Sequence, residues 1–110
     1  MSIANKRPQD EIWGIQLPAY VILDSAWQTE REAQKRMVTL SHNGYNNTGF
    51  FWIPDFKFLN GVELYQVYIG PFANITDAKK SVCQYNKRFK VNTYGVKLSL
   101  KPGREEVRCN

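Results

Sequence analysis

Two amphipathic helical patterns, each preceded by a helix-start signal, constrain this fold most. The second pattern begins at Asn74-Ile75-Thr76-Asp77, and apolar residues then recur at the spacing of one helix face: Ala78, Val82, Tyr85 and Phe89. The first follows the capping-box sequence Thr29-Glu30-Arg31-Glu32 and continues with Ala33, Met37 and Leu40. Asn43-Gly44 is a C-terminal stop signal. The sequence therefore predicts two helices, each with one face against a core.

Four β-rich runs surround these helices. We predict strands over residues 20–23, 49–53, 62–69 and 94–100. Pro54 should end the second strand, and Gly70-Pro71 should break the third. The order β-α-β-β-α-β predicts an α+β, ferredoxin-like fold, in which a four-stranded antiparallel sheet carries both helices on one face.

The length of 110 residues fits one domain. We expect residues 1–17 to form an N-terminal tail, with Ile12, Trp13 and Ile15 as candidates for packing on the domain. The domain should run over 18–102, from Pro18 to the Pro102-Gly103 breaker, and residues 103–110 should form a charged C-terminal tail.

The cysteines do not fix a compartment. Cys83 and Cys109 form no CxxC pair and have no neighbouring His, so we predict no zinc site, and no cofactor. We expect a free, buried Cys83 and a free Cys109 in the tail rather than a disulfide. No apolar run is long enough to cross a bilayer, and none resembles a signal peptide. Either the chain is cytoplasmic or it is a fragment of an exported protein.

Strand alternation assigns the two sheet faces. The residues predicted to face the helices are Val21, Leu23, Tyr65, Val67, Ile69, Val96 and Leu98, whereas their neighbours should face outward: Tyr20, Ile22, Leu64, Gln66, Tyr68, Lys97 and Ser99. In strand 49–53 either Phe50 and Trp52, or Phe51 and Ile53, face outward. So much exposed apolar surface predicts a binding site, unless the segment with Trp13 or a second copy covers it.

One run in the third strand carries a resemblance. Tyr65-Gln66-Val67-Tyr68-Ile69-Gly70-Pro71-Phe72 resembles the Tyr-x-Val-x-(Val/Ile)-Gly-Pro-Phe hallmark of SPOR (sporulation-related repeat) domains. Upstream, VILDSAWQTEREA over residues 21–33 looks like the first strand and helix start of that family, and Gly44-Tyr45 like its step into the second strand. The resemblance covers about residues 19–101.

The resemblance implies a non-catalytic module that binds peptidoglycan glycan strands, particularly strands stripped of stem peptides at division sites. It places the parent protein in the periplasm or cell envelope and therefore favours a fragment of an exported protein. Membrane contact is then expected only through a segment that this chain lacks. The ligand would lie on the open sheet face, where the expected binding residues are Tyr20, Ile22, Trp52, Gln66, Tyr68, Lys97 and Ser99.

This sequence departs from the family pattern in its first strand. Many family members have Gln where this chain has Ile22, and Gly near Asp24. A Gln could hydrogen-bond a sugar, and Ile cannot.

Other functions were weighed against this one. The net charge of +5 suits an anionic partner, such as nucleic acid, an acidic glycan or a membrane surface, or simply a solvated basic face. RRM-like RNA binding through Tyr20 and Tyr68 is disfavoured, because the third strand lacks the RRM aromatic signature. A protein-interaction or self-association module using the open face stays open. An enzyme is the least favoured class, since His42 is the only histidine and no catalytic set stands out.

Overall fold

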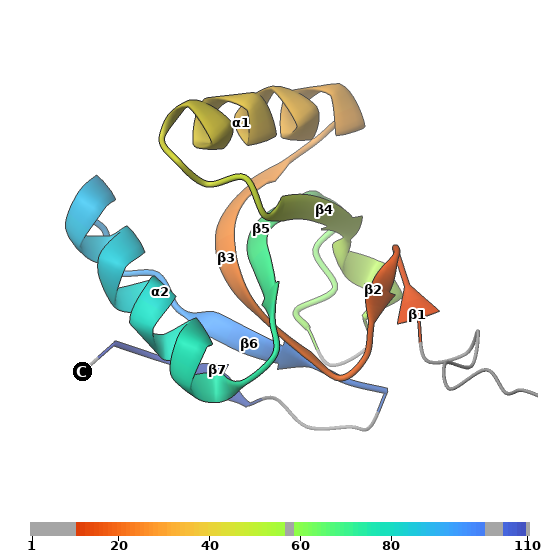
Figure 1. The fold of residues 1–110 in the computed structure, drawn as a ribbon. Coiled ribbons are helices and arrows are strands. Elements are labelled where there is room, and N and C mark those ends of the chain that lie inside the picture. The colour runs from red at the N-terminus through yellow and green to blue at the C-terminus, as the bar shows by residue number, and fades with distance from the viewer. Residues whose placement is uncertain (1–10, 57–58, 101–104, 110) are drawn as a thin grey trace, which may run out of the picture.

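The computed structural model describes residues 11–56, 59–100 and 105–109. The expected domain end at Pro102-Gly103 lies outside these residues. Along the chain (Figure 1) the elements are β1 Glu11–Ile12, β2 Ile15–Gln16, β3 Ala19–Trp27, α1 Glu30–His42, β4 Thr48–Trp52, a 3-10 helix Ile53–Asp55, β5 Tyr65–Phe72, α2 Ile75–Phe89, β6 Gly95–Leu98 and β7 Glu106–Val107.

The main sheet has five strands in the order β4-β5-β3-β6-β7, and each neighbouring pair is antiparallel. The α+β class with an antiparallel sheet and two helices is confirmed, but the prediction of four strands was wrong. The fifth strand, β7, lies in the segment expected to be a charged tail. It pairs with β6 because Val107 is buried and lies opposite Gly95.

Both helices begin where the capping signals predict. Thr29 caps α1 through a complete capping box with Glu32. Asn74 caps α2 by accepting a hydrogen bond from the backbone nitrogen of Asp77. Asn43 is the C-cap of α1, which confirms the stop predicted there.

Gly70-Pro71 does not break β5, contrary to the sequence expectation. The strand continues to Phe72, which pairs with Tyr20 of β3. Gly70 has a φ of +127°, and a Cβ there would lie 3.1 Å from the backbone oxygen of Tyr20. Glycine therefore lets the chain bend and stay in the sheet, because an L side chain would be strained at this φ and crowded by β3.

Two apolar layers enclose the sheet. The helix-side core packs α1 and α2 onto one face, with Ile22, Val67 and Ile69 from the strands. We call the layer on the opposite face the outer core. It buries sheet residues against the N-terminal hairpin and the connection that follows β4, and its members are Ile15, Leu17, Ala19, Val21, Phe51, Ile53, Phe56, Tyr68, Val96 and Leu98. In Figure 1 α2 and the β1–β2 hairpin lie on opposite sides of β3 and β5.

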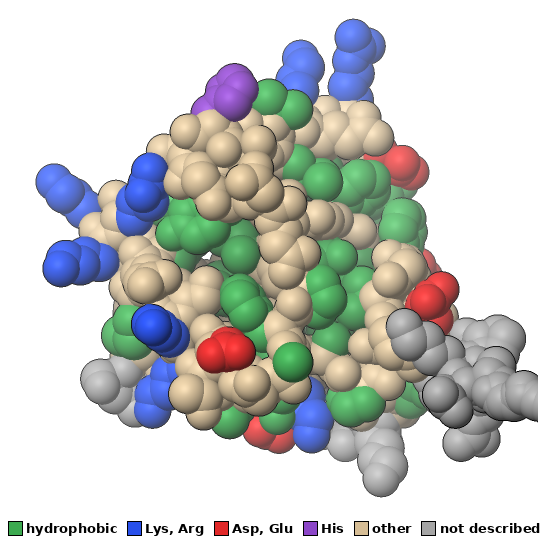
Figure 2. All heavy atoms as spheres, in the orientation of Figure 1, with side chains coloured by type: hydrophobic (Ala, Val, Ile, Leu, Met, Phe, Trp, Pro, Cys, Tyr) green, Lys and Arg blue, Asp and Glu red, His purple; other side chains and the backbone are tan. Residues whose placement is uncertain are grey.

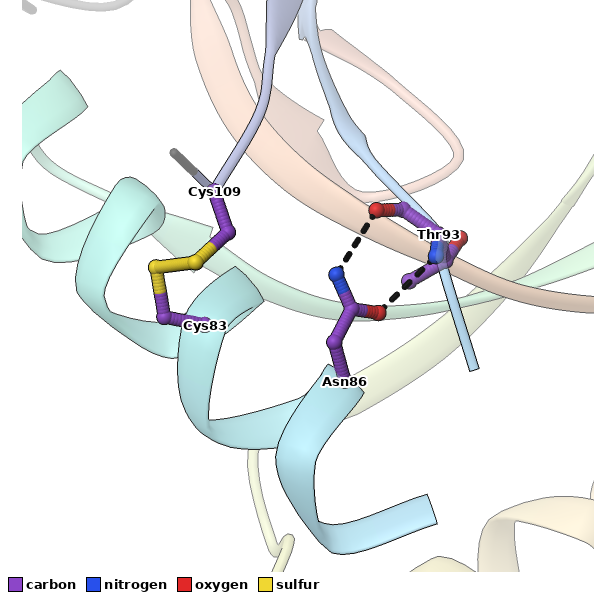
Figure 3. Close-up of a disulfide and its surroundings, with 4 residues drawn as sticks. All are labelled: Cys83, Asn86, Thr93 and Cys109. Carbon is purple, nitrogen blue, oxygen red and sulfur yellow. Dashed lines mark hydrogen bonds between the residues drawn. A yellow bond between two sulfur atoms is a disulfide. The ribbon is translucent and has the colours of Figure 1, made fainter. Parts of the chain in front are cut away.

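Cys83 and Cys109 form a disulfide, so the expectation of two free thiols was wrong. Figure 3 shows the bridge between α2 and the segment after β7. The two residues are 26 positions apart in sequence, and sequence spacing gave no sign of their contact. Pairing of β7 with the sheet edge brings Cys109 to the side of α2. Asn86 and Thr93, joined by two hydrogen bonds, fix the connection between α2 and β6.

A buried carboxylate ties both helices to β3. Asp24, whose side chain is fully buried, accepts hydrogen bonds of 2.7 and 2.9 Å from Nε and Nη2 of Arg36 on α1. It also accepts hydrogen bonds from the hydroxyls of Tyr85 on α2 and Ser25. Burial alone would raise the pKa of Asp24, but these hydrogen bonds and the Arg36 charge together hold it below its ordinary value.

Candidate functional site

The faces of β3 are the reverse of those predicted. Val21 lies in the outer core with Leu23 packed against it, whereas Ile22 lies in the helix-side core with Tyr20 beside it. Every position from 20 to 23 is apolar, so alternation alone could not choose the phase. The prediction assumed that the outer face is open, and the structure shows a second core there.

The faces of β6 are reversed in the same way as those of β3, because residues that lie opposite each other on paired strands point to the same face of the sheet. Val96 is opposite Val21, and both Val96 and Leu98 lie in the outer core rather than facing the helices. Lys97 is opposite Tyr20 on the helix side, with its Nζ 5.9 Å from the centre of the Tyr20 ring. Both assignments therefore correct the sequence prediction for β6.

The faces of β5 agree with the prediction. Val67 and Ile69 lie in the helix-side core and Tyr65 packs against it, whereas Tyr68 lies in the outer core. Gln66 is opposite Phe51, an outer-core residue, and its amide donates to the backbone oxygens of Ser25 and Val67.

The outer face of the sheet is sealed rather than open. Tyr68 is only 6% exposed, and its ring stacks on Phe51 with the ring centres 5.8 Å apart. Phe56, from the connection after β4, also packs against Phe51, edge to face, with the ring centres 4.7 Å apart. Burial raises the pKa of the Tyr68 hydroxyl. Ile15 and Leu17 complete the cover, so the alternative of a cover from the N-terminal segment is confirmed, although Trp13 itself lies elsewhere.

The structure does not bring the seven predicted site residues together on one surface. Phe51 and Ile53 of strand 49–53 belong to the outer core, and Trp52 is opposite Tyr65 on the other face. The helix-side residues are therefore Tyr20, Ile22, Trp52 and Lys97, whereas Gln66 and Tyr68 lie on the sealed face. Ser99 follows the end of β6 and is half-buried. Their contact with a ligand stays a prediction.

Four aromatic side chains instead gather at the β4 edge. We call Trp13, Phe50, Trp52 and Tyr65 the aromatic cluster. Tyr65 is its centre, with ring centres 4.7 Å from Trp52, 5.9 Å from Phe50 and 6.4 Å from Trp13. Trp13 also lies 5.8 Å from Phe50. Trp13 is 39% exposed and the other three are partly exposed, so the rings are held in place and remain accessible.

A two-residue hairpin turn presents Trp13. Ile12 and Ile15 pair across it, and the turn residues Trp13 and Gly14 have φ values of +56° and +74°. Positive φ at both central residues is typical of the tight turns that join antiparallel strands, but it is rare for a residue as bulky as Trp. Nε1 of Trp13 donates a 2.7 Å hydrogen bond to Oδ2 of Asp55. Ring contacts and this hydrogen bond together hold the strained residue, and such strained backbone positions cluster at functional sites.

Figure 2 shows hydrophobic side chains exposed between α1 and the β1–β2 hairpin, over β4. Trp and Tyr combine a flat apolar ring with a polar group at its rim, which suits ligands that have both apolar faces and hydroxyl groups. Trp13 lies in the segment, residues 1–17, that the sequence predicts to be a tail. The available signal was Gly14 between the apolar Ile12 and Ile15, a short hairpin pattern.

Within the described parts of the chain, no group of three or more His, Cys, Asp or Glu side chains could hold a metal ion. Among those same residues, no helix is long and apolar enough to span a bilayer.

The fold and surface define a small α+β module with a disulfide and an aromatic patch at one sheet edge. The SPOR domain family model matches residues 9–88, so the chain belongs to the SPOR domain family, as the Gly-Pro-Phe run indicated. This is a family of binding domains that generally bind peptidoglycan, in proteins of the envelope or division septum. The search of curated proteins and the search of solved structures each gave no match.

Proposed function

We propose that this chain is a non-catalytic module that binds peptidoglycan glycan strands through the aromatic cluster. The observation that carries the proposal is Trp13, a partly exposed indole fixed by Asp55 and by ring contacts, in a chain whose family generally binds peptidoglycan. The outer sheet face offers no comparable surface, because the N-terminal segment and the connection after β4 seal it.

The chemistry of a glycan fits this cluster. A pyranose ring has an apolar face of C–H groups and a rim of hydroxyl and N-acetyl groups. The rings of Trp13, Trp52 and Tyr65 supply apolar faces over a short distance. Asp55 is exposed and uses Oδ2 for Trp13, so Oδ1 can accept a hydrogen bond from a sugar hydroxyl.

The disulfide supports an oxidising location for the parent protein. Disulfides persist in secreted and envelope proteins and are rare in a reducing cytosol. The Cys83–Cys109 bridge therefore supports the proposed cell-envelope location.

Co-sedimentation with peptidoglycan sacculi tests the function. We expect the protein to pellet with sacculi, and more so after amidase treatment removes the stem peptides. Trp13→Ala and Trp52→Ala should each weaken pelleting about tenfold, because one aromatic stacking contact contributes roughly 1–3 kcal/mol. Val38→Ala, at an apolar residue on α1 that is 56% exposed, is the matched control and should pellet like wild type. Unchanged pelleting by both Trp variants would reject the aromatic cluster, and no pelleting of the wild type would reject the function.

A further inference from the structure

Five of the 15 Lys and Arg residues of the chain lie on the second helix and at its C-cap. Between Lys79 and Lys90 there are five exposed cations and no acidic residue: Lys79, Lys80, Lys87, Arg88 and Lys90. Asp77 is the one acidic residue within α2 itself. We call these five cations the basic face of α2.

The geometry of α2 turns these charges to solvent. Ala78, Val82 and Tyr85 are buried against the sheet. Lys80 and Lys87, seven positions apart, fall on the opposite side of the helix, about 10 Å from each other along its axis. Among the described residues, neither lysine has an ion-pair partner. Both ammonium groups are therefore available to anionic groups outside the molecule.

Apolar side chains accompany this charge. Ile75 at the first turn of α2 is 43% exposed, and Val91 just beyond its end is 48% exposed. A shallow hollow on the first turns of α2, beside the disulfide, is lined by Ile75, Thr76, Lys79, Lys80 and Cys83. Helices that lie on membranes typically combine two features. Their apolar side chains reach the acyl boundary, and their lysine side chains lie along apolar surface with the charges in the headgroup region.

From these features we infer that the basic face of α2, with Ile75, docks onto an anionic lipid surface. Charge complementarity selects an anionic partner, and the exposed apolar residues favour lipid over a soluble polyanion, which would use the charges alone. This interaction differs from the sequence-based expectation that membrane contact needs a segment outside this chain.

The proposed surface is separate from the aromatic cluster. In Figure 1 α2 and the β1–β2 hairpin lie at opposite sides of the molecule, and Figure 2 shows Lys and Arg side chains gathered over α2 on the side away from the hairpin. One module could therefore contact a glycan strand and a lipid surface together. The inference does not depend on glycan binding.

Vesicle co-sedimentation tests the inference. At low salt we expect the protein to pellet with vesicles of equimolar phosphatidylcholine and phosphatidylglycerol but not with phosphatidylcholine alone, and high salt should release it. The double variant Lys80→Glu/Lys87→Glu should bind the mixed vesicles at least about tenfold more weakly. The matched control Arg31→Glu/Lys35→Glu places the same charge change on the exposed face of α1 and should keep most of the binding.

A second variant separates lipid from other polyanions. Ile75→Ser should weaken binding to mixed vesicles severalfold and leave any binding to soluble polyphosphate unchanged. No vesicle binding at low salt, equal loss in both charge variants, or full vesicle binding by Ile75→Ser would each overturn the inference. Sacculus pelleting should be unchanged in Lys80→Glu/Lys87→Glu, so failure here and failure of glycan binding are distinguishable.

Discussion

Nε1 of Trp13 donates a 2.7 Å hydrogen bond to Oδ2 of Asp55, which lies 42 positions further along the chain. This bond joins the N-terminal hairpin to the 3-10 helix that follows β4. The proposed glycan site therefore depends on two segments outside the four predicted strands, and its most exposed ring is held by a side chain from the connection between β4 and β5.

Removal of the Asp55 carboxylate should disturb the site more than the fold. We predict that Asp55→Ala weakens sacculus pelleting severalfold, because the indole of Trp13 loses its acceptor, and lowers the free energy of unfolding by only about 1 kcal/mol. Asp55→Asn retains an acceptor oxygen and should pellet close to wild type. Pelleting assays and urea unfolding of both variants check this. Equal pelleting by Asp55→Ala and wild type would show that the bond does not position Trp13 for binding.

Tyr68 should matter to stability and not to glycan binding. Tyr68→Ala empties part of the outer core, where the ring stacks on Phe51, and should lower the free energy of unfolding by about 3–5 kcal/mol. Tyr68→Phe keeps the ring and should change it by less than about 1 kcal/mol. Thermal and urea unfolding measure both effects. A marked loss of glycan binding in a fully folded Tyr68→Phe would restore the outer sheet face as the site.

Gly49 makes room for the Tyr68 ring across the β4–β5 pair. A Cβ on Gly49 would lie 2.6 Å from Cζ of Tyr68. We predict that Gly49→Ala destabilises the protein by about 1–3 kcal/mol, because the ring must shift within a packed core. The control is Ala73→Ser at an exposed position. Gly61→Ala would not serve as a control, because Gly61 has a φ of +73° and an alanine there would be strained. Equal melting temperatures for Gly49→Ala and wild type would contradict this packing.

The disulfide should contribute strongly to stability. Closing a loop over 26 positions is worth roughly 3.5 kcal/mol in the unfolded-chain entropy model. Cys83→Ser, Cys109→Ser and the double variant should therefore each lower the free energy of unfolding by about 2–4 kcal/mol, and reductant should do the same to wild type alone. If reductant destabilises the double variant as much as wild type, the effect does not come from this bridge.

Asp24 makes stability depend on pH in acid. Its folded pKa lies below the ordinary value of 3.8, so its contribution is full above about pH 4 and is lost as the pH falls through the folded pKa. At pH 7 Asp24→Asn should cost about 3 kcal/mol, because Arg36 loses its partner. The difference in the free energy of unfolding between Asp24→Asn and wild type, measured by urea unfolding, should become smaller below pH 4. The exposed Glu63→Gln is the control, and a gap that is constant with pH would contradict the assignment.

The sequence predicted both helices and the four longer strands, because local signals define them, but it did not predict the short strands β1, β2 and β7. The capping residues Thr29 and Asn74 begin the two helices, and the spacing of Ala78, Val82 and Tyr85 identified the buried face of α2. It could not predict the phase of β3, because both sets of alternate residues are apolar. The phase is decided by Ile15 and Phe56, which come from segments without a strong periodic pattern.

The candidate site was predicted in part. Trp52 was among the expected binding residues, and it lies in the aromatic cluster, but on the face opposite to the one expected. Trp13 was named only as a residue that could pack on the domain. Its position depends on a hairpin turn and on contact with Asp55, and such long-range contacts cannot be read from spacing in one sequence.

The most direct test of the account follows the indole N–H signals in an NMR titration with peptide-free glycan strands. The Nε1–H signals of Trp13 and Trp52 should shift with increasing ligand, while the backbone amide signals of α2 and β7 should stay in place. Shifts confined to the residues around Lys80 and Lys87, or indole signals that do not move at saturation, would contradict binding at the aromatic cluster.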